Sequence, residues 1–153
     1  MIILVVRLGL RAGEVAAVKL DDLRWGVGEL VVRGKGGGRD ALPMPVDVGQ
    51  ALADYLCRRG AGGGEDRRAF LHVQAPRWGV TMTDVRAAVR RACGRAGIAD
   101  TGTHRFRHSL ASDMLAEGTR LAEIGQVLRH RHLETTPLYA KVDDRALATT
   151  ART

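Results

Sequence analysis

The carboxyl-terminal third of the sequence contains side chains that together could do chemistry on a phosphodiester. These are His104, Arg107, His130 and Tyr139. An arginine can grip phosphate oxygens through two parallel hydrogen bonds. A tyrosine hydroxyl, with an ordinary pKa of about 10, becomes a useful nucleophile only where cations stabilise the phenolate and another group accepts its proton. With Arg11 and Lys35 upstream, the set indicates a site for DNA strand transfer.

Three of the basic residues fall at helical spacing. On a helix, His104, Arg107 and His108 occupy positions i, i+3 and i+4 and share one face. They would lie in the first turn, where unpaired backbone N–H groups and the helix dipole favour an anion. The spacing therefore predicts a phosphate site. An amphipathic helix that merely starts with solvated basic residues has the same pattern.

The two histidines also have the i, i+4 spacing of a zinc-binding helix. In such a helix a glutamate follows the first histidine, but Arg105 stands at that position and no carboxylate lies between the histidines. A cation beside the site argues against a bound metal ion. We therefore expect no metal ligands here.

A lysine lies in the glycine-rich segment Gly34-Lys35-Gly36-Gly37-Gly38. Glycine tolerates the positive φ that a hairpin tip needs, and the segment lacks the spacing of a nucleotide-binding P-loop. A flexible tip could carry the Lys35 ammonium into a DNA groove, where it could protonate a leaving 5′-oxygen as a general acid. A lysine that only solubilises the turn would leave the same sequence.

Composition limits the class of protein. A chain of 153 residues has the length of one domain. Hydrophobic residues make up 45% and aromatic residues 4%, so the core must come from Leu, Val, Ile and Ala, which suits a helix-rich domain. The 24 basic residues outnumber the 17 acidic ones, and the net charge is +7. Such a field attracts polyanions, nucleic acid above all, although an arginine-rich surface can also reflect a GC-rich genome.

The cysteines and the first residues indicate the cellular compartment of the protein. Cys57 and Cys93 lie far apart, without CxxC spacing or secretory context, which favours reduced thiols in the cytoplasm. The apolar start from Met1 to Val6 ends at Arg7, too soon for a signal core or a membrane span. It indicates a helix or strand whose upstream half is missing.

Hydrophobic periodicity and turn residues predict a single mixed domain, mainly α-helical, with a small three-stranded antiparallel β-sheet near residues 22–45. The strands are expected around Leu23-Trp25, Glu29-Arg33 and Asp40-Met44. Leu8-Gly9-Leu10-Arg11 is expected to form a turn before a helix from Glu14 to Leu20, which Asp21-Asp22 ends. Asp47 is expected to cap a helix that runs to about Arg59, and Thr81 or Thr83 an amphipathic helix that runs to Gly97. Further helices are expected over His104 to Glu117 and Arg120 to Leu128, hinged at Gly118-Thr119, before a short helix that carries Tyr139.

Five separated motifs resemble those of one family, in order and over nearly the whole chain. Leu8-Gly9-Leu10-Arg11-Ala12-Gly13-Glu14 resembles the box Thr-Gly-Leu-Arg-x-x-Glu, Gly34-Lys35-Gly36 a lysine-bearing hairpin, and His104-Arg105-Phe106-Arg107 the box His-x-x-Arg. Leu128-Arg129-His130 resembles Leu-Gly-His, and Tyr139 lies nine residues after His130, as the family's nucleophile does. The chain is similar to the catalytic domain of the tyrosine recombinases, the phage integrase family.

This resemblance implies a reaction. Tyr139 would attack the scissile phosphate, form a 3′-phosphotyrosyl link and free a 5′-hydroxyl; a second 5′-hydroxyl would reverse the step on a partner strand. Bond energy is conserved, so no cofactor, ATP or metal is required. Arg11 and Arg107 would neutralise charge on the non-bridging oxygens and His130 would add a hydrogen bond there, each such donor being worth roughly 3–4 kcal/mol of barrier.

The resemblance also implies the supporting residues. His104 would handle the tyrosine proton and Lys35 the leaving oxygen, while Glu14 and His108 would orient the catalytic groups from behind. Further basic residues are expected on DNA, namely Arg33, Arg39, Arg105, Arg129 and Arg131. The implied partner is double-stranded DNA, on which family members assemble as tetramers.

The sequence departs from the family at three places. Leu8 stands where Thr is usual, and Arg129 replaces the Gly before His130. Family members also carry a helical core-binding domain upstream, so we expect residues 1–153 to be an amino-terminally truncated catalytic domain without it. Two other functions remain open: a nicking and relaxing activity of the topoisomerase type, and a non-catalytic DNA-binding remnant of a mobile-element gene.

Overall fold

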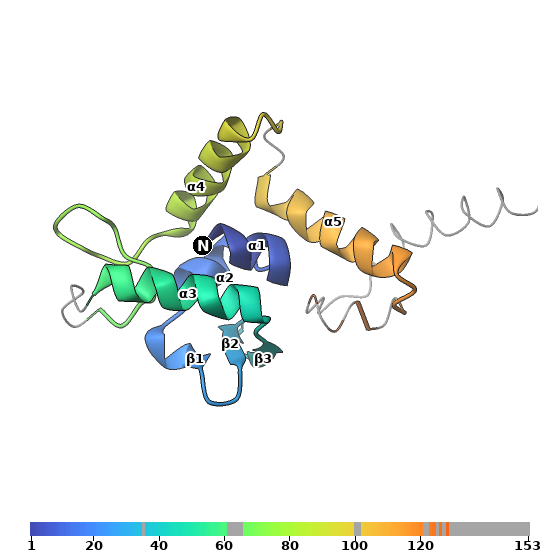
Figure 1. The fold of residues 1–153 in the computed structure, drawn as a ribbon, viewed down its shortest axis with the longest axis horizontal. Helices are drawn as coiled ribbons and strands as arrows, with labels where there is room; N and C mark the ends of the chain where they lie inside the picture. The colour runs from blue at the N-terminus through green and yellow to red at the C-terminus, as the bar shows by residue number, and fades with distance from the viewer. Residues whose placement is uncertain are drawn as a thin grey trace, which may run out of the picture. The chain divides into compact units, whose positions relative to one another are not determined.

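The computed structural model describes residues 1–34, 36–60, 66–99 and 102–120, together with Glu123, Ile124, Gln126 and Leu128. The chain divides into two compact units, Met1–Arg107 and His108–Thr153, which are described separately below. The first unit contains four helices, a short 3-10 helix and one sheet in its described part, and the start of a fifth helix (Figure 1). No helix in the described part of the chain is long and apolar enough to cross a membrane.

The first apolar segment is a helix, α1 (Ile2–Leu8), and a second helix, α2 (Ala12–Ala17), follows closely. Gly9 ends α1 in the left-handed region, with φ 60° and ψ 27°. The predicted helix from Glu14 to Leu20 is shifted, because Arg11 caps α2 with the help of Glu14 and the chain extends at Val18. Leu20 instead begins the 3-10 helix η1 (Leu20–Asp22).

The three-stranded antiparallel sheet is confirmed, in the order β1 (Leu23–Arg24), β2 (Glu29–Arg33) and β3 (Arg39–Pro43). In β2, Leu30, Val31 and Val32 are buried between two half-buried ends. Arg33 pairs with Arg39 at the end of the β2–β3 ladder, next to the hairpin tip. Gly36 and Gly37 there have φ values of 94° and 81°, which only glycine adopts readily.

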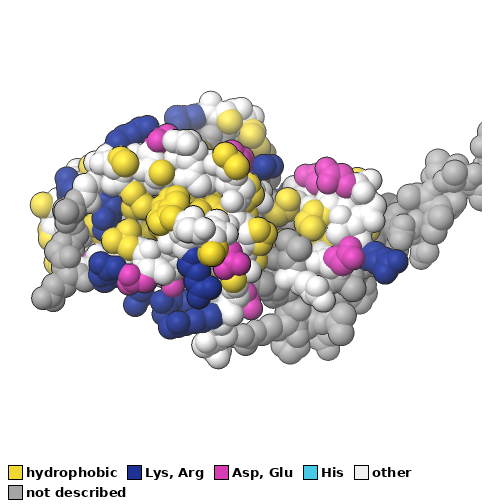
Figure 2. Space-filling view, turned by 60° about the horizontal axis from the view of Figure 1, so that its bottom comes forward, with side chains coloured by type: hydrophobic (Ala, Val, Ile, Leu, Met, Phe, Trp, Pro, Cys, Tyr) yellow, Lys and Arg dark blue, Asp and Glu magenta, His cyan; other side chains and the backbone are white. Residues whose placement is uncertain are grey.

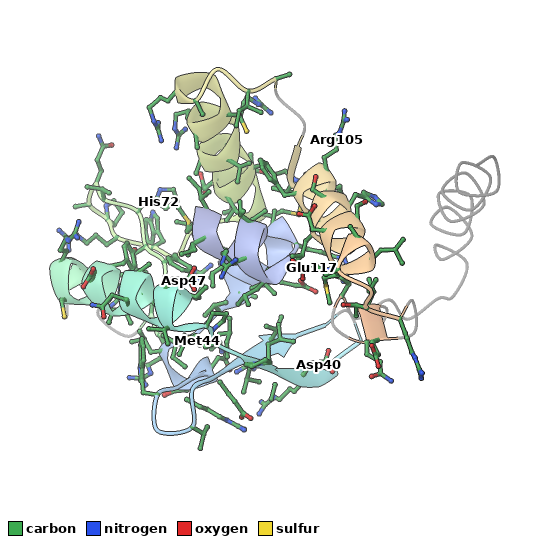
Figure 3. All side chains as sticks on the ribbon, turned by 45° about the vertical axis from the view of Figure 1, so that its right-hand side comes forward. Asp40, Met44, Asp47, His72, Arg105 and Glu117 are labelled. Carbon is green, nitrogen blue, oxygen red and sulfur yellow. The ribbon has the colours of Figure 1, made fainter. Side chains whose placement is uncertain are left out.

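Helix α3 (Val46–Arg59) corrects one prediction about capping. Asp47 was expected to cap this helix, but the N-cap residue is Pro45 and no side chain caps the helix by a hydrogen bond. Asp47 lies in the first turn instead, labelled in Figure 3, and accepts a hydrogen bond of 2.9 Å from Arg7 Nε. Further along α3, the Tyr55 ring packs against Phe70 with 5.2 Å between ring centroids.

Helix α4 (Met82–Arg95) begins where the sequence indicated. Thr81 is its N-cap: the Thr81 hydroxyl accepts from the Asp84 N–H, and Asp84 Oδ2 accepts from the Thr81 N–H at 2.7 Å. Gly97, with φ 66°, follows its end as predicted. Val85, Val89 and Cys93 are buried on one side of α4, so the amphipathic pattern found in the sequence is the packing pattern of the helix.

The core of the first unit is aliphatic, as the low aromatic content requires. Its large fully buried side chains are Leu and Val, with Phe70 as the one aromatic among them. They come from all parts of this unit: Leu4, Val5, Leu10, Val15, Val18, Leu30, Val32, Val48, Leu52, Phe70 and Val85. On the outside, Lys and Arg side chains are spread around apolar ones (Figure 2).

The second unit continues helix α5 (Gly102–Ala116) from His108 onward. The helix ends before Gly118, whose φ is 86°, in agreement with the predicted hinge at Gly118-Thr119. Beyond the hinge, the Ile124 N–H donates to the Arg120 carbonyl, and Ile124 packs with Ala111 and Leu128 in a small core. The predicted helix that carries Tyr139 lies outside the described residues.

Candidate active site

Arg11 lies at the amino-terminal end of α2, where a buried carboxylate holds it. Glu14, only 8% exposed, accepts a hydrogen bond from the Arg11 backbone N–H at 2.8 Å and one from Arg11 Nη1 at 3.1 Å. The Arg11 side chain remains 43% exposed. Glu14 therefore fixes both the backbone and the guanidinium of Arg11, while the side chain stays partly open to solvent and can meet an anion.

Arg107 projects from α5 into the first unit and is 5% exposed. Its Nη1 donates a hydrogen bond of 2.6 Å to the carbonyl oxygen of Gly9. Gly9 precedes Arg11 by two residues, in the loop between α1 and α2. The loop that carries the first arginine therefore also binds the second one, although the two arginines are far apart in the sequence.

One expectation about this helix is wrong. His104, Arg107 and His108 were placed in the first turn, but α5 starts at Gly102, so only His104 lies there. The backbone N–H groups of the helix start therefore do not share one turn with the Arg107 guanidinium. What holds this guanidinium is the Gly9 carbonyl, an acceptor on a distant segment.

The neighbours of Arg107 on α5 are more accessible. His104 and Arg105 are exposed, and the Arg105 side chain extends outward from the helix (Figure 3). His108 is half-buried and belongs to the second unit. Among the residues that the structure describes, no group of three or more His, Cys, Asp or Glu side chains could hold a metal ion.

The tip end of the β2–β3 hairpin carries two of the arginines predicted to meet DNA. Arg33 Nη2 and Nε donate to Asp22 at 2.9 and 3.4 Å, and Asp22 is 4% exposed. The hydrogen bond and charge of Asp22 raise the pKa of the Arg33 guanidinium above its ordinary value. Arg39, opposite Arg33 in the ladder, is exposed. Arg33 thus has a structural partner inside the fold.

Two groups at these sites were missed by the sequence reasoning. Asp22 was treated only as a residue that ends a helix, yet it accepts hydrogen bonds from the Lys19 backbone N–H and from Arg33. Gly9 was treated only as part of a turn. The start of β1 at the apolar Leu23, directly after Asp22, could have suggested a buried carboxylate, but no local pattern points from Gly9 to Arg107.

Five of the predicted site residues lie outside the described residues: Lys35, Arg129, His130, Arg131 and Tyr139. Their roles stay predictions. The predicted site residues that the structure describes include Arg11 and Glu14 at the start of α2, and His104 and Arg107 on α5. The Gly9 carbonyl joins the α1–α2 loop to Arg107. Two guanidiniums held at one loop can bind a phosphate through paired, directional hydrogen bonds.

Comparison with known proteins decides the family. The model of the phage integrase family matches residues 1–146. The chain belongs to the phage integrase family. Its sequence is 51% identical over 154 residues to the "Putative integrase/recombinase y4rA" of Sinorhizobium fredii, covering 99% of this chain and 37% of that protein. It is 33% identical over 146 residues to the tyrosine recombinase XerA of Pyrococcus furiosus, covering 93% of this chain and 49% of that protein.

Solved structures show the same fold. The crystal structure of XerA recombinase matches with a TM-score of 0.80 at 24% identity, over 98% of this chain and 56% of that one. The XerH site-specific recombinase bound to its palindromic difH substrate matches with a TM-score of 0.79 at 23% identity, over 97% and 43%. The mainly helical fold with a small antiparallel sheet is therefore that of tyrosine recombinase catalytic domains. The chain spans between about a third and a half of the length of these curated relatives.

Proposed function

We propose that residues 1–153 form the catalytic domain of a tyrosine-type site-specific DNA recombinase, which cleaves and rejoins DNA through a 3′-phosphotyrosine intermediate. The observation that carries this proposal is the α1–α2 loop, which presents Arg11 and binds Arg107 through the Gly9 carbonyl. A phosphate-binding site needs such a tie, because each guanidinium must be oriented toward the same group.

In the proposed cleavage step, the Tyr139 oxygen attacks the scissile phosphorus. A bond forms from the tyrosine oxygen to phosphorus, and the bond from phosphorus to the 5′-oxygen breaks. His104 takes the tyrosine proton, and Lys35 gives a proton to the leaving 5′-oxygen. Arg11, Arg107 and His130 bind the non-bridging oxygens, where charge builds in the transition state.

Glu14 has a defined part in this mechanism. Because its carboxylate binds both the backbone N–H and the guanidinium of Arg11, it restricts the directions that the arginine can take. The burial of Glu14 limits the competition of water for its carboxylate. Glu14 therefore orients Arg11 before DNA arrives, which lowers the ordering that binding must impose.

The proposed partner is double-stranded DNA. The support is the net charge of +7 and the DNA-bound relatives, among them XerH with its difH substrate. Arg39 and Arg105, both exposed, are proposed to contact phosphates beside the site, and Arg129 and Arg131 are proposed to do so near His130. Exchange of strands between two sites needs several copies, so assembly on DNA belongs to the same proposal.

The identity of the nucleophile can be tested by substitution, because the chain has only two tyrosines, Tyr55 and Tyr139. We would incubate the protein at high concentration with nicked duplexes of random sequence, from which a cut strand end diffuses away and traps the covalent intermediate. We expect a denaturation-resistant protein–DNA adduct, and peptide mass spectrometry should place the DNA on Tyr139. Tyr139→Phe should abolish the adduct.

Tyr55→Phe is the matched control. Tyr55 packs against Phe70 and accepts a hydrogen bond from the Leu71 N–H, so this variant removes a phenol from the core without touching the proposed site. The Tyr55→Phe adduct should match wild type in yield and in insensitivity to EDTA. An adduct that persists in Tyr139→Phe, or one that needs magnesium, would overturn the proposed mechanism. DNA binding without any covalent adduct would support the alternative that the chain is a non-catalytic DNA-binding remnant. Relaxation of supercoiled DNA without strand exchange would support the topoisomerase-type activity.

A further inference from the structure

We propose that Gly9 is a positioning residue of this site, whose carbonyl oxygen sets the place of the Arg107 guanidinium relative to the loop that carries Arg11. The inference rests on the proposed function and adds a backbone group to it. Neither arginine could keep its position if the loop changed its path. The path of this loop depends on the backbone conformation of Gly9, which is buried.

Gly9 is buried and takes φ 60° and ψ 27° at the end of α1. In this left-handed conformation the chain reverses, and the following residue, Leu10, donates its N–H to the Leu4 carbonyl at 3.2 Å. An L-residue with a Cβ avoids this region, whereas glycine enters it freely. The left-handed turn therefore determines where the Gly9 carbonyl points.

That carbonyl accepts a hydrogen bond of 2.6 Å from Arg107 Nη1, across 98 residues of sequence. Two residues after Gly9, the chain begins α2 at Arg11, which Glu14 holds in place. A single short loop thus carries one guanidinium and supplies an acceptor for the other. A change of the Gly9 backbone angles would move the carbonyl oxygen that Arg107 binds, without replacing either arginine.

A planar guanidinium binds a phosphate through directional bonds, so its orientation matters more than its charge. Misplacement of a catalytic group by about 1 Å can cost on the order of 10²-fold in rate. DNA affinity comes instead from the sum of many phosphate contacts. Displacing Arg107 through Gly9 should therefore slow the chemical step and leave DNA binding almost unchanged.

The chain offers a matched control in Gly97. It follows α4 in the same left-handed region, with φ 66°, and the next residue, Ile98, donates its N–H to the Cys93 carbonyl at 2.9 Å. A Cβ at Gly97 would meet nothing within 4 Å. Gly97→Ala thus also places an alanine in the left-handed region after a helix, at an exposed position.

The experiment compares wild type, Gly9→Ala and Gly97→Ala in single-turnover cleavage of the nicked DNA, in a DNA-binding isotherm and in thermal unfolding. We expect cleavage by Gly9→Ala to fall by on the order of 10–10²-fold, with its DNA affinity kept. Gly97→Ala should cleave as wild type does. Equal cleavage by the two folded variants would overturn the role of Gly9.

A second measurement covers the case in which Gly9→Ala does not fold. In wild-type protein labelled with ¹⁵N and ¹³C, a scalar coupling across the hydrogen bond should connect Arg107 Nη1 to the Gly9 carbonyl carbon. Its absence would contradict the proposal, and its presence together with wild-type cleavage by Gly97→Ala would support it. A wild-type chain that forms no covalent adduct would refute the proposed function. If the wild type is active and Gly9→Ala cleaves DNA as fast as Gly97→Ala, only the role of Gly9 is refuted.

Discussion

Two regions of the first unit hold arginine side chains in different ways. At the α1–α2 loop, Arg107 donates to the neutral carbonyl of Gly9, and Arg11 stays 43% exposed beside Glu14. At the tip end of the β2–β3 hairpin, Arg33 donates twice to Asp22, a carboxylate that is only 4% exposed. The first region arranges guanidiniums around a loop, and the second places a guanidinium beside a buried negative charge.

The difference teaches that a shared residue type does not imply a shared task. A buried carboxylate needs a partner, because taking a charge out of water is costly unless it is paired and hydrogen-bonded. Arg33 meets this need for Asp22, so it contributes to stability whatever else it does. The arginines at the α1–α2 loop are candidates for chemistry. Variants of the two regions should therefore separate activity from stability.

The largest effect is expected at the α1–α2 loop. Arg11→Lys and Arg107→Lys keep a positive charge but lose the planar fork, so single-turnover cleavage should fall by roughly 10²–10³ for each, the scale of a lost transition-state donor. DNA affinity should change little. Arg58→Lys, on the exposed side of α3, is the control. If the wild type and all three variants cleave DNA at the same rate, the two arginines are not catalytic, and the domain is only a DNA-binding module.

A smaller effect, on folding, is expected where Asp22 binds Arg33 at the tip end of the hairpin. Asp22→Ala removes the acceptor of the Lys19 N–H and of Arg33, so the free energy of unfolding should drop by about 1–3 kcal/mol, the cost of unpaired buried polar groups. The neighbouring Asp21→Ala removes only an exposed pair with Arg67 and should have no measurable effect. Urea unfolding measures both; matching midpoints for the two variants would contradict the distinction.

The smallest effect is expected on the free energy of unfolding at acidic pH. Hydrogen bonds from the Arg68 side chain, from the Arg68 N–H and from the Gly79 N–H lower the pKa of Asp66 from 3.8 to about 2. Because the pKa is depressed in the folded state, the stability from Asp66 is complete above pH 3.8 and is lost as the pH falls toward 2. Asp66→Asn should flatten this part of the curve of unfolding free energy against pH. An unchanged slope would show that Asp66 does not join these segments in solution.

Much of the fold was predictable because its signals are local. Strand-forming residues on both sides of a glycine-rich tip identified β2 and β3, and Thr81, one of two candidate caps, identified the start of α4. The boundaries of α2 and the cap of α3 were wrong by a few residues. There a capping carboxylate, Glu14, and a proline, Pro45, decided the helix starts, and hydrophobic spacing does not register either effect.

The sequence by itself determined the family, the sheet, the aliphatic core and the set of chemically competent residues, since each depends on residue type and short spacing. Only the tertiary structure decided that the carbonyl of Gly9 holds Arg107 and that Asp22 holds Arg33. A hydrogen bond to a backbone carbonyl is possible at every residue, so it leaves no mark on the amino-acid pattern. It exists only once distant segments are packed together, and the orientation of the proposed site depends on it.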